Sequence, residues 1–349
     1  MYSAYVRRGN IVHLRSDIVC DGFNEAPYGV RVQTHVHDDH MQEWPNSMHR
    51  NIYMTPATKK LILAEKFRSS EHLRNNLVVM EPDGNRFCSD LMQGDFALFN
   101  SGHMLGSCMV SVSHDRKRYF YTSDFSWPLP NTDRELLEKE YHDVLVIDAS
   151  YGHPEKSIRR YTQENVIQEL LSIVSREIQN HTIRIVAHRG RLQRAYQILA
   201  SELETSAIDI YGSEHVNKTI EIYHKYLGMA GTSYKGLEHP STGKNGNKII
   251  LVDTRDQKVL ETPNPADIII RLNETRSKDC LSVKTEHGYQ ICMTDHADFW
   301  GTIDMINLIN PSAGVLTNGT YAYELATYIK EEMGREACCA VMPTDSLAG

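Results

Sequence analysis

The chain has 349 residues, 41% of them hydrophobic, which is enough to bury one large core or one core with an inserted second lobe. Its 37 basic and 45 acidic residues give a net charge of −8, so the chain as a whole does not attract nucleic acid, and any polyanion must be held by a local patch. The apolar runs are far shorter than the roughly 20 residues of a membrane span, and residues 1–14 lack a secretory signal, so we expect a cytoplasmic protein that does not bind membranes.

The predicted elements change in character along the chain. Residues 1–150 alternate short apolar runs with polar turns and show little helical periodicity, which predicts a β-rich part. Further on, apolar residues at helical spacing predict helices, and short continuous apolar runs predict strands. The predicted helices are residues 162–178, 192–203, 215–227 and 298–309, and the predicted strands are residues 248–252 and 267–272. Residues 228–248 are rich in Gly, Ser and Thr and are expected to form a loop. The chain is therefore predicted to be α/β.

Three histidines and two aspartates crowd six positions in the segment HVHDDH, from His35 to His40. The preceding RVQT has the pattern of a short strand that would present this segment at its end. Histidines at i and i+2, followed by Asp and His at i+4 and i+5, can supply two neighbouring metal sites from one loop. His35 and His37 would take one ion, and Asp39 and His40 the other. A polar surface loop is the alternative for this segment taken alone.

Four further residues of the metal-ligating types share one setting, because each follows an apolar, strand-like run. They are His103 in FALFNSGHMLGS, Asp124 in RYFYTSDFS, Asp148 in DVLVIDASYG and His296 in GYQICMTDHADF. Each alone has an ordinary alternative, such as a turn histidine, a helix cap or a surface histidine. Together they predict that the strand ends converge on one edge of a sheet and form a site there.

The predicted metal ligands are imidazoles and carboxylates rather than thiolates. The seven cysteines are scattered, odd in number and without a CxxC pair, which argues against a cysteine zinc site or a disulfide framework. The histidine-rich first site favours Zn2+, whereas Mn2+ is an alternative for the second site.

The order of these motifs resembles that of the metallo-β-lactamase superfamily and, within it, of the β-CASP nucleases. The motifs are IVCDGF with Asp21, HVHDDH, SGHMLGS, YTSDFS, DASYG and TDHADF, and the resemblance covers nearly the whole chain. Residues 18–41 are similar to the start of the Artemis-type DNA repair nucleases. HRGRLQRAYQIL and residues 294–319 are similar to segments of the DNA ligase-associated exonucleases and of the RNA-processing exonucleases.

The resemblance implies a set of metal ligands and a residue that supports them. The first zinc would be held by His35, His37 and His103, the second by Asp39 and His40, and Asp124 would bridge the two. Asp21 would lie behind the histidine loop and steady it, the kind of support that fixes the tautomer and orientation of a ligand.

The segment VLTNGT departs from the family pattern, which has a histidine at the position of Asn318 that adds a ligand to the second metal. An amide is a poor zinc ligand beside imidazole, so the second site is expected to be weaker. Artemis-type enzymes also lack this histidine, so Asn318 is compatible with activity.

The implied ligand set predicts phosphodiester hydrolysis. Two divalent ions roughly 3.5 to 4 Å apart can hold a hydroxide between them and stabilise the charge of a phosphodiester in line for attack. Asp148 and His296 match the first two β-CASP motifs, and His296 oriented by Asp148 is the candidate general acid for the leaving oxygen. With Asp39, these two are the predicted catalytic residues.

Basic side chains in two segments are candidates for binding phosphate. Arg189, Arg191 and Arg194 lie around Gly190 at the start of a predicted helix, where backbone N–H groups and the helix dipole favour an anion. A second group follows the DASYG turn and consists of Lys156, Arg159 and Arg160. For Arg159 and Arg160, a solvated helix face is an equal alternative.

The resemblance implies a four-layer αββα sandwich made of residues 1–155 and 276–349, with a β-CASP α/β lobe of residues 156–275 inserted and an active cleft between the lobes. It also implies a nuclease that acts on single-stranded DNA or RNA. Family likeness favours an exonuclease over an endonuclease.

Three alternatives remain open. The chain can be a metallo-hydrolase of a small ester, thioester or cyclic phosphodiester, although the inserted lobe and the GRLQR segment count against this. It can be a subunit that binds nucleic acid without catalysing a reaction. It can also be a component of a larger repair, processing or defence assembly.

Overall fold

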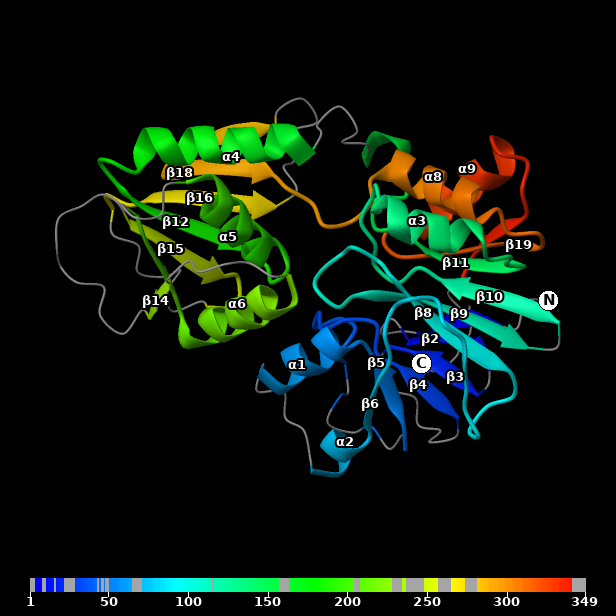
Figure 1. Cartoon of the computed structure of the whole chain (residues 1–349). Coiled ribbons are helices and arrows are strands. Elements are labelled where there is room, and N and C mark those ends of the chain that lie inside the picture. The colour runs from blue at the N-terminus through cyan, green and yellow to red at the C-terminus, as the bar shows by residue number, and fades with distance from the viewer. Residues whose placement is uncertain are drawn as a thin grey trace, which may run out of the picture. The chain divides into compact units, whose positions relative to one another are not determined.

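The computed structural model describes residues 4–340 except for 8–10, 16, 22–28, 43, 45–46, 48–49, 65–70, 115, 157–162, 204–207, 228–233, 237–247, 257–264 and 274–280. The chain divides into two compact units. The first unit is formed by Met1–Arg159 together with His296–Gly349, and the second unit is Arg160–Asp295 (Figure 1). The second unit ends later than the expected residue 275, because the strands between residues 282 and 292 pair into its sheet.

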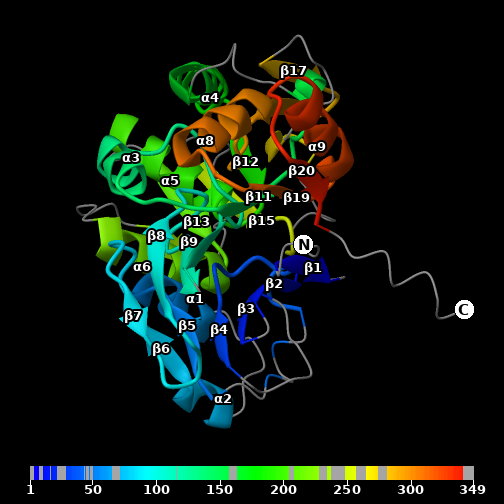
Figure 2. The same ribbon diagram turned by 90° about the vertical axis from the view of Figure 1, so that its right-hand side faces the viewer.

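The first unit contains two sheets. Sheet A has the order β1-β2-β3-β4-β5-β6, and Figure 2 shows these strands side by side from β6 to β1. The strands are β1 (Tyr5–Arg7), β2 (Ile11–Arg15), β3 (Ile18–Cys20), β4 (Val30–Val32), β5 (Ile52–Met54) and β6 (Leu77–Val79). The pairs from β1 to β3 are antiparallel and those from β3 to β6 are parallel.

Sheet B has the order β20-β19-β11-β10-β9-β8-β7. The strands are β7 (Phe87–Cys88), β8 (Asp95–Asn100), β9 (Cys108–His114), β10 (Lys117–Tyr121), β11 (Val144–Asp148), β19 (Gly314–Asn318) and β20 (Ala337–Cys339). The pairs from β7 to β10 are antiparallel, whereas β10, β11, β19 and β20 run parallel. The last part of the chain thus extends a sheet that the first part began.

The inner strands of sheet B, such as β8 and β11, bury both faces, which explains why they read as continuous apolar runs. Side chains alternate between the faces along a strand. In β11, Val144 and Val146 join the core shared with sheet A, while Leu145 and Ile147 join the core beneath the helices. The two sheets therefore pack face to face around one core, and a second core lies between sheet B and its helices.

Helices cover the outer faces of the sandwich. The helices α3 (Asn131–Glu138), α8 (Phe299–Ile309) and α9 (Ala322–Glu331) contribute to the second core and lie over sheet B (Figure 1). Of the remaining two, α1 (Pro56–Ala64) contacts β6 in sheet A, and α2 (Glu71–Asn75) lies next along the chain. The predicted αββα sandwich is confirmed.

The second unit is the inserted α/β lobe and contains one sheet, of order β14-β13-β15-β12-β16-β18-β17. Its strands are β12 (Thr182–Ala187), β13 (Asp209–Gly212), β14 (Tyr234–Gly236), β15 (Lys248–Asp253), β16 (Ile268–Asn273), β17 (Ser282–Thr285) and β18 (Gly288–Cys292). All neighbouring pairs are parallel except β17 with β18. Its helices are α4 (Gln163–Glu177), α5 (Arg191–Glu202) and α6 (Glu214–Leu227), and they form a core with the sheet.

The predicted helices and strands agree with the structure to within one or two residues, because each has a clear apolar face or a clear apolar run. Other elements were not predicted, among them the helices α1, α2, α3 and α9. Tyr234–Gly236 forms β14 inside the segment expected to be a loop, because it pairs with β13, which no local pattern indicates. The rest of that segment, apart from residues 234–236 and 248, lies outside the described residues. No helix in the described ranges is both long and apolar enough to cross a bilayer.

One buried polar residue of this fold has a consequence for stability. His142 lies between α3 and β11, its Nε2 is 3.0 Å from the Ser111 hydroxyl, and its ring packs on Phe120. Burial, and then the charges of Arg86 and Arg118, lower the pKa of His142 to about 3. The folded protein therefore holds this imidazole neutral.

We predict that the first unit loses stability as the pH falls below the value of an ordinary histidine, about 6.5, and that His142 causes part of the loss. In this range the unfolded chain binds a proton that the folded chain does not, so acid favours unfolding. In His142→Gln the free energy of unfolding should fall less steeply, by up to about 1.4 kcal/mol per pH unit. Urea denaturation at several pH values between about 7 and 5 measures this, and equal slopes in the two proteins would refute it.

Candidate metal centre

The histidine loop follows β4 (Val30–Val32), which overlaps the short strand predicted for RVQT. The loop closes in a tight turn, with the His40 amide 3.0 Å from the His37 carbonyl oxygen. His35, His37 and His40 are buried, whereas Asp38 and Asp39 are exposed. The loop therefore turns its imidazoles inward, and its aspartates lie at the surface.

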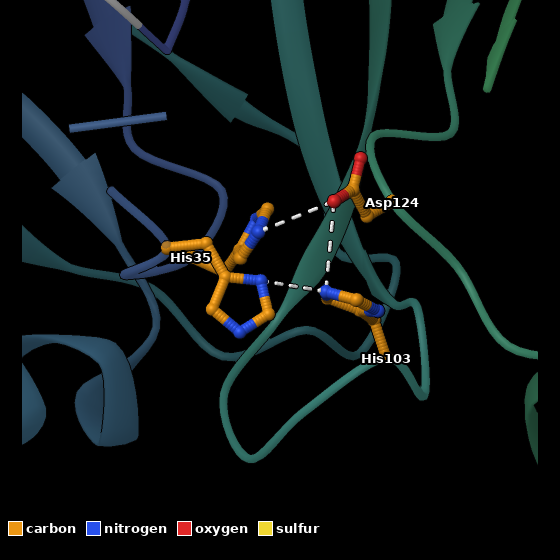
Figure 3. A group of neighbouring side chains, drawn as sticks. His35, His103 and Asp124 are labelled. Carbon is orange, nitrogen blue, oxygen red and sulfur yellow. Dashed lines mark hydrogen bonds and ion pairs between the residues drawn. The ribbon is translucent and has the colours of Figure 1, made fainter. Parts of the chain in front are cut away.

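Four of the predicted ligands form a compact group. The side chains of His35, His37, His103 and Asp124 each offer a ligand atom, and these atoms all lie within 4.8 Å of one another. His103 comes from the loop between β8 and β9, and Asp124 from the loop after β10. Figure 3 shows the Asp124 carboxylate and the rings of His35 and His103 facing one another from these separate segments.

The two oxygens of Asp124 face different partners. Oδ2 lies 3.5 Å from Nε2 of His35 and 3.5 Å from Nε2 of His103, whereas Oδ1 lies 3.3 Å from Nε2 of His40. Nε2 of His40 is also 3.6 Å from Oδ2 of Asp39. A carboxylate placed in this way can contact two neighbouring cations, one with each oxygen. The second of these positions is more open, because the Asp39 side chain is 57% exposed.

The hydrogen bonds around His35 leave one ring nitrogen available for a metal. Nδ1 of His35 is 3.1 Å from the Thr34 hydroxyl, and that hydroxyl donates to Asp21. The hydroxyl oxygen can therefore accept from Nδ1–H, which leaves the lone pair on Nε2. Nε2 is buried and makes no hydrogen bond within the described part of the chain. Burial, reinforced by the charge of His40, holds the pKa of His35 well below its usual range, as a neutral ligand requires. The residues thus fit a metal ion.

Asp21 is fully buried behind the loop and binds it at three points. It accepts hydrogen bonds from the Thr34 amide at 2.8 Å and from the Thr34 hydroxyl, and its Oδ2 is 2.8 Å from Nδ1 of His40. The last contact directs Nε2 of His40 towards Asp124. These bonds hold the loop, while a role of Asp21 in metal binding stays a prediction.

Contacts within the centre shift the pKa values of His40 and Asp124 in opposite directions. Burial acts to lower the pKa of His40, but the carboxylates of Asp124 and Asp21 outweigh it and hold that pKa well above its usual range. Burial acts to raise the pKa of Asp124, but the charges of His40 and His296 outweigh it and hold that pKa well below its usual range. Asp124 is therefore ionised and attracts positive charge to the centre.

Gln33 holds the histidine loop by hydrogen bonds and was not among the predicted site residues. Its amide nitrogen donates to the carbonyl oxygens of His35 at 2.7 Å and His40 at 3.1 Å, and to Oδ1 of Asp21 at 3.3 Å. Its amide oxygen accepts from the buried guanidinium of Arg31 at 2.5 Å. The alternation of polar side chains in RVQT, next to a ligand segment, was the available signal, but it does not reveal these partners.

The loop of His103 is anchored by the start of α1, a second support that was missed. The Gly106 carbonyl oxygen accepts hydrogen bonds from the hydroxyls of Thr55 at 2.7 Å and Thr58 at 2.8 Å. Gly106 has a φ of +80°, and a Cβ on it would lie 2.7 Å from the Thr58 amide nitrogen. Only glycine fits this approach, which ties the first helix of the chain to a metal-ligand loop.

Asp148 and His296 form a pair beside this centre. Nδ1 of His296 is 2.9 Å from Oδ2 of Asp148, and Nε2 of His296 is 3.8 Å from Oδ2 of Asp124. The amide and hydroxyl of Ser150 donate to the other oxygen of Asp148 at 2.8 and 2.7 Å. Asp148 therefore holds the ring of His296 so that Nε2 faces Asp124.

The expectation that the four strand-end residues share one sheet holds for three of them. His103, Asp124 and Asp148 follow or end strands of sheet B, whereas the histidine loop follows β4 of sheet A. The strand before His296, β18, belongs to the sheet of the second unit, so the expectation is wrong for His296. Within the first unit, packing of sheets A and B brings the histidine loop to the strand ends of sheet B.

Asn318 is the last residue of β19 and pairs with Asp148 in the neighbouring strand β11. Its carbonyl oxygen accepts from the Ala149 amide at 2.6 Å. The position that departs from the family pattern therefore adjoins the Asp148–His296 pair. The expected weakness of the second metal site stays a prediction.

The basic residues predicted to bind phosphate differ in exposure. Arg189 is fully buried, which counts against a direct contact with phosphate. Nε of Arg191 lies 3.4 Å from Oδ2 of Asp295, and burial lowers the pKa of Arg194. Binding of nucleic acid by these three stays a prediction. Arg159 and Arg160 lie outside the described residues.

We predict that Gln33→Glu weakens metal binding by about 10- to 100-fold, the usual effect of losing a residue that supports a ligand. Glutamate keeps an acceptor for Arg31 but cannot donate to the two loop carbonyls, and its charge opposes Asp21. Competition with a chromogenic chelator measures the affinity for zinc, and circular dichroism checks the fold. Gln168→Leu, on the exposed face of α4, is the matched control. Equal affinity in Gln33→Glu and the parent would show that the loop holds its shape without this amide.

Comparison with known proteins gives partial sequence relatives and a solved structure with the same fold. No protein-family model matches the chain. It is 24% identical over 228 residues to an RNase J-like protein of Methanocaldococcus jannaschii, covering 59% of this chain and 52% of that protein. It is 28% identical over 141 residues to the endoribonuclease YSH1 of Mycosarcoma maydis, covering 38% of this chain and 16% of the relative. It is 25% identical over 251 residues to the endoribonuclease ysh1 of Schizosaccharomyces pombe, covering 62% and 32%.

Among solved structures, a protein of unknown function from Enterococcus faecalis superposes with a TM-score of 0.60 at 13% identity, over 93% of this chain and 82% of that one, which shows the fold alone. The chain spans about half the length, or less, of the curated relatives it matches. The motif order, the sandwich with its inserted lobe and these likenesses together confirm that the chain is related to the β-CASP nucleases of the metallo-β-lactamase superfamily.

Proposed function

We propose that the protein is a metal-dependent nuclease that hydrolyses phosphodiester bonds of single-stranded nucleic acid. The observation that carries this proposal is the placement of Asp124, which faces His35 and His103 with one oxygen and His40 with the other. The Asp148–His296 pair lies beside it. A centre with room for two cations and an adjacent imidazole has the groups that phosphodiester hydrolysis requires.

The residues fit two cation sites of unequal affinity. Three imidazoles and a carboxylate form the first group, a ligand set that favours zinc. The second group is Asp39, His40 and the other oxygen of Asp124, with Asn318 in place of a further histidine, so a weaker site that also accepts Mn2+ is expected. When bound, such ions supply Lewis-acid stabilisation of the phosphoryl charge and activate water as the nucleophile.

The protein's own residues then orient the metal ligands and protonate the leaving oxygen. Asp21, Thr34 and Gln33 hold the histidine loop rigid, so that the ligands need no reorganisation during the reaction. Asp148 binds Nδ1 of His296 and leaves Nε2 facing the centre. From there His296 delivers a proton to the leaving oxygen, whose departure as an alkoxide would otherwise be slow.

We also propose which nucleic acid is cut and where: RNA or DNA, from an end of the strand. The relatives are named as RNase J-like and as endoribonucleases, which supports RNA as a substrate class. The likeness of HRGRLQRAYQIL and the last motifs to exonucleases of DNA and RNA supports digestion from an end. The alternatives are a small-molecule hydrolase, a silent binding subunit and a component of a repair, processing or defence assembly, and the first test below separates a nuclease from the small-molecule hydrolase and from the silent subunit.

The first test is digestion of matched single-stranded DNA and RNA, labelled at either end, with or without a 5′ phosphate, in zinc or manganese. Mononucleotide release is expected, and chelation or the Asp39→Ala/His40→Ala double variant should abolish it, because both remove the second cation position. Internal fragments instead of mononucleotides would assign endonuclease activity. No cleavage of either polymer would refute the proposal, and turnover of a small ester, thioester or cyclic phosphodiester would then identify the alternative.

The role of His296 is tested by changing the leaving group. We predict that His296→Asn slows cleavage of a natural strand by about 10²- to 10⁴-fold, the usual contribution of a general acid. Hydrolysis of bis(p-nitrophenyl) phosphate should change little, because p-nitrophenolate leaves without a proton. His287→Asn, at an exposed histidine of the second unit, is the control. Equal losses on both substrates would place His296 in metal binding rather than in proton transfer.

A further inference from the structure

Two segments of the first unit meet beside the Asp148–His296 pair. One is the segment after β11, residues 149–156, and the other is the turn after β19. The Tyr321 amide donates to the Ala149 carbonyl oxygen at 3.0 Å. A Cβ on Gly152 would lie 2.8 Å from the Tyr321 carbonyl oxygen, so the backbones are in close contact. The side chains of the two segments are therefore held at fixed positions relative to each other.

These segments carry a row of aromatic and cationic side chains that starts at the centre. The ring of Tyr151 lies 5.9 Å from that of His296, between centroids. The ring of His153 lies 6.0 Å from that of Tyr321, and Nζ of Lys156 is 5.5 Å from the Tyr321 ring centroid. The four side chains of the row are partly exposed, and none belongs to a hydrophobic core cluster: Tyr151, His153, Lys156 and Tyr321.

The ring of His153 and the ammonium of Lys156 are both held beside Tyr321. The backbone N–H of Glu155 donates to Nδ1 of His153 at 3.1 Å, which fixes the orientation of the ring. The ammonium of Lys156 lies against the face of Tyr321, where a cation is attracted by the ring. The row thus offers flat rings and one positive charge, in place of the close packing of a core.

We propose that Tyr151, His153, Lys156 and Tyr321, the tyrosine platform, bind the nucleotides next to the bond that is cut. This inference rests on the proposed nuclease function and adds to it where the bases of the strand lie. Nucleobases stack on aromatic rings whatever their sequence, and a lysine beside the stack pairs with a phosphate. Bases in a duplex are already stacked and paired, so such a platform selects single strands, of DNA or of RNA.

The position of the platform connects it to cleavage. Asp148 ends β11, and the first platform segment follows it directly. Tyr151 contacts the ring of the candidate general acid, while Lys156 at the end of the first segment lies over the ring of Tyr321 in the second segment. A base held on the platform therefore places its neighbouring phosphate near His296 without any reading of base identity. Lys156, a candidate phosphate contact from its sequence, has an aromatic partner in the structure.

The test is the binding of fluorescent single-stranded oligonucleotides to the full chain, by anisotropy, in the Asp39→Ala/His40→Ala background so that the strand stays intact. Tyr321→Ala should weaken binding of oligothymidylate and oligouridylate by roughly 5- to 100-fold, the usual effect of losing one stacked base. Tyr321→Trp should retain the affinity. An abasic strand of equal length should bind both proteins equally weakly. Tyr323→Ala, at a 74% exposed tyrosine of α9, is the matched control and should bind as the parent does.

A second variant and a second substrate keep the outcomes separate. Lys156→Gln, at the edge of the platform, should weaken binding less and reduce its dependence on salt. The abasic strand is the second substrate, and it should bind Tyr321→Ala and the parent alike because it has no base to stack. Unchanged binding of base-containing strands by both variants would overturn the platform. A base-dependent loss of binding in a protein that cuts no strand would refute the nuclease function and leave the platform standing.

Discussion

The site depends on one ionised carboxylate, that of Asp124, held among imidazoles. Burial alone disfavours a charged carboxylate, and here the charges of His40 and His296 outweigh that cost. The two oxygens point at different histidines, so one carboxylate contacts the imidazoles of both expected cation positions. The fold of the first unit brings those imidazoles to this carboxylate from separate parts of the chain.

The two sheets do this by ending their strands at a common place. Sheet A delivers the histidine loop and sheet B delivers His103, Asp124 and Asp148. Hydrogen bonds fix the loops that carry the ligands. Asp21 and Gln33 bind the histidine loop, and the hydroxyls of Thr55 and Thr58 bind the loop of His103 through Gly106. Buried polar networks of this kind are stable only when every member has a partner, which explains why the support is made of several short hydrogen bonds.

The chain departs at Asn318 from the pattern of the nucleases that it resembles, and that position adjoins the Asp148–His296 pair. Asn318 pairs with Asp148 at the end of a parallel strand, so a change there affects the neighbourhood of this pair. The next residues along the chain lead to Tyr321, which lies against Lys156. The turn after Asn318 thus contributes an aromatic side chain that packs with the segment following Asp148.

The sequence by itself determined the types of ligand, because the chemistry of an imidazole or a carboxylate belongs to the residue, and HVHDDH places five such residues on one loop. It also determined the helices α4, α5, α6 and α8, whose apolar spacing is a local property. Only the tertiary structure decided that the ligands come from two sheets, that Gln33 bridges Arg31 and the loop, that Arg189 is buried and that Tyr321 meets Lys156. Each of these depends on contacts that packing creates between segments distant in the chain or between strands, and the order of residues along one segment carries no record of them.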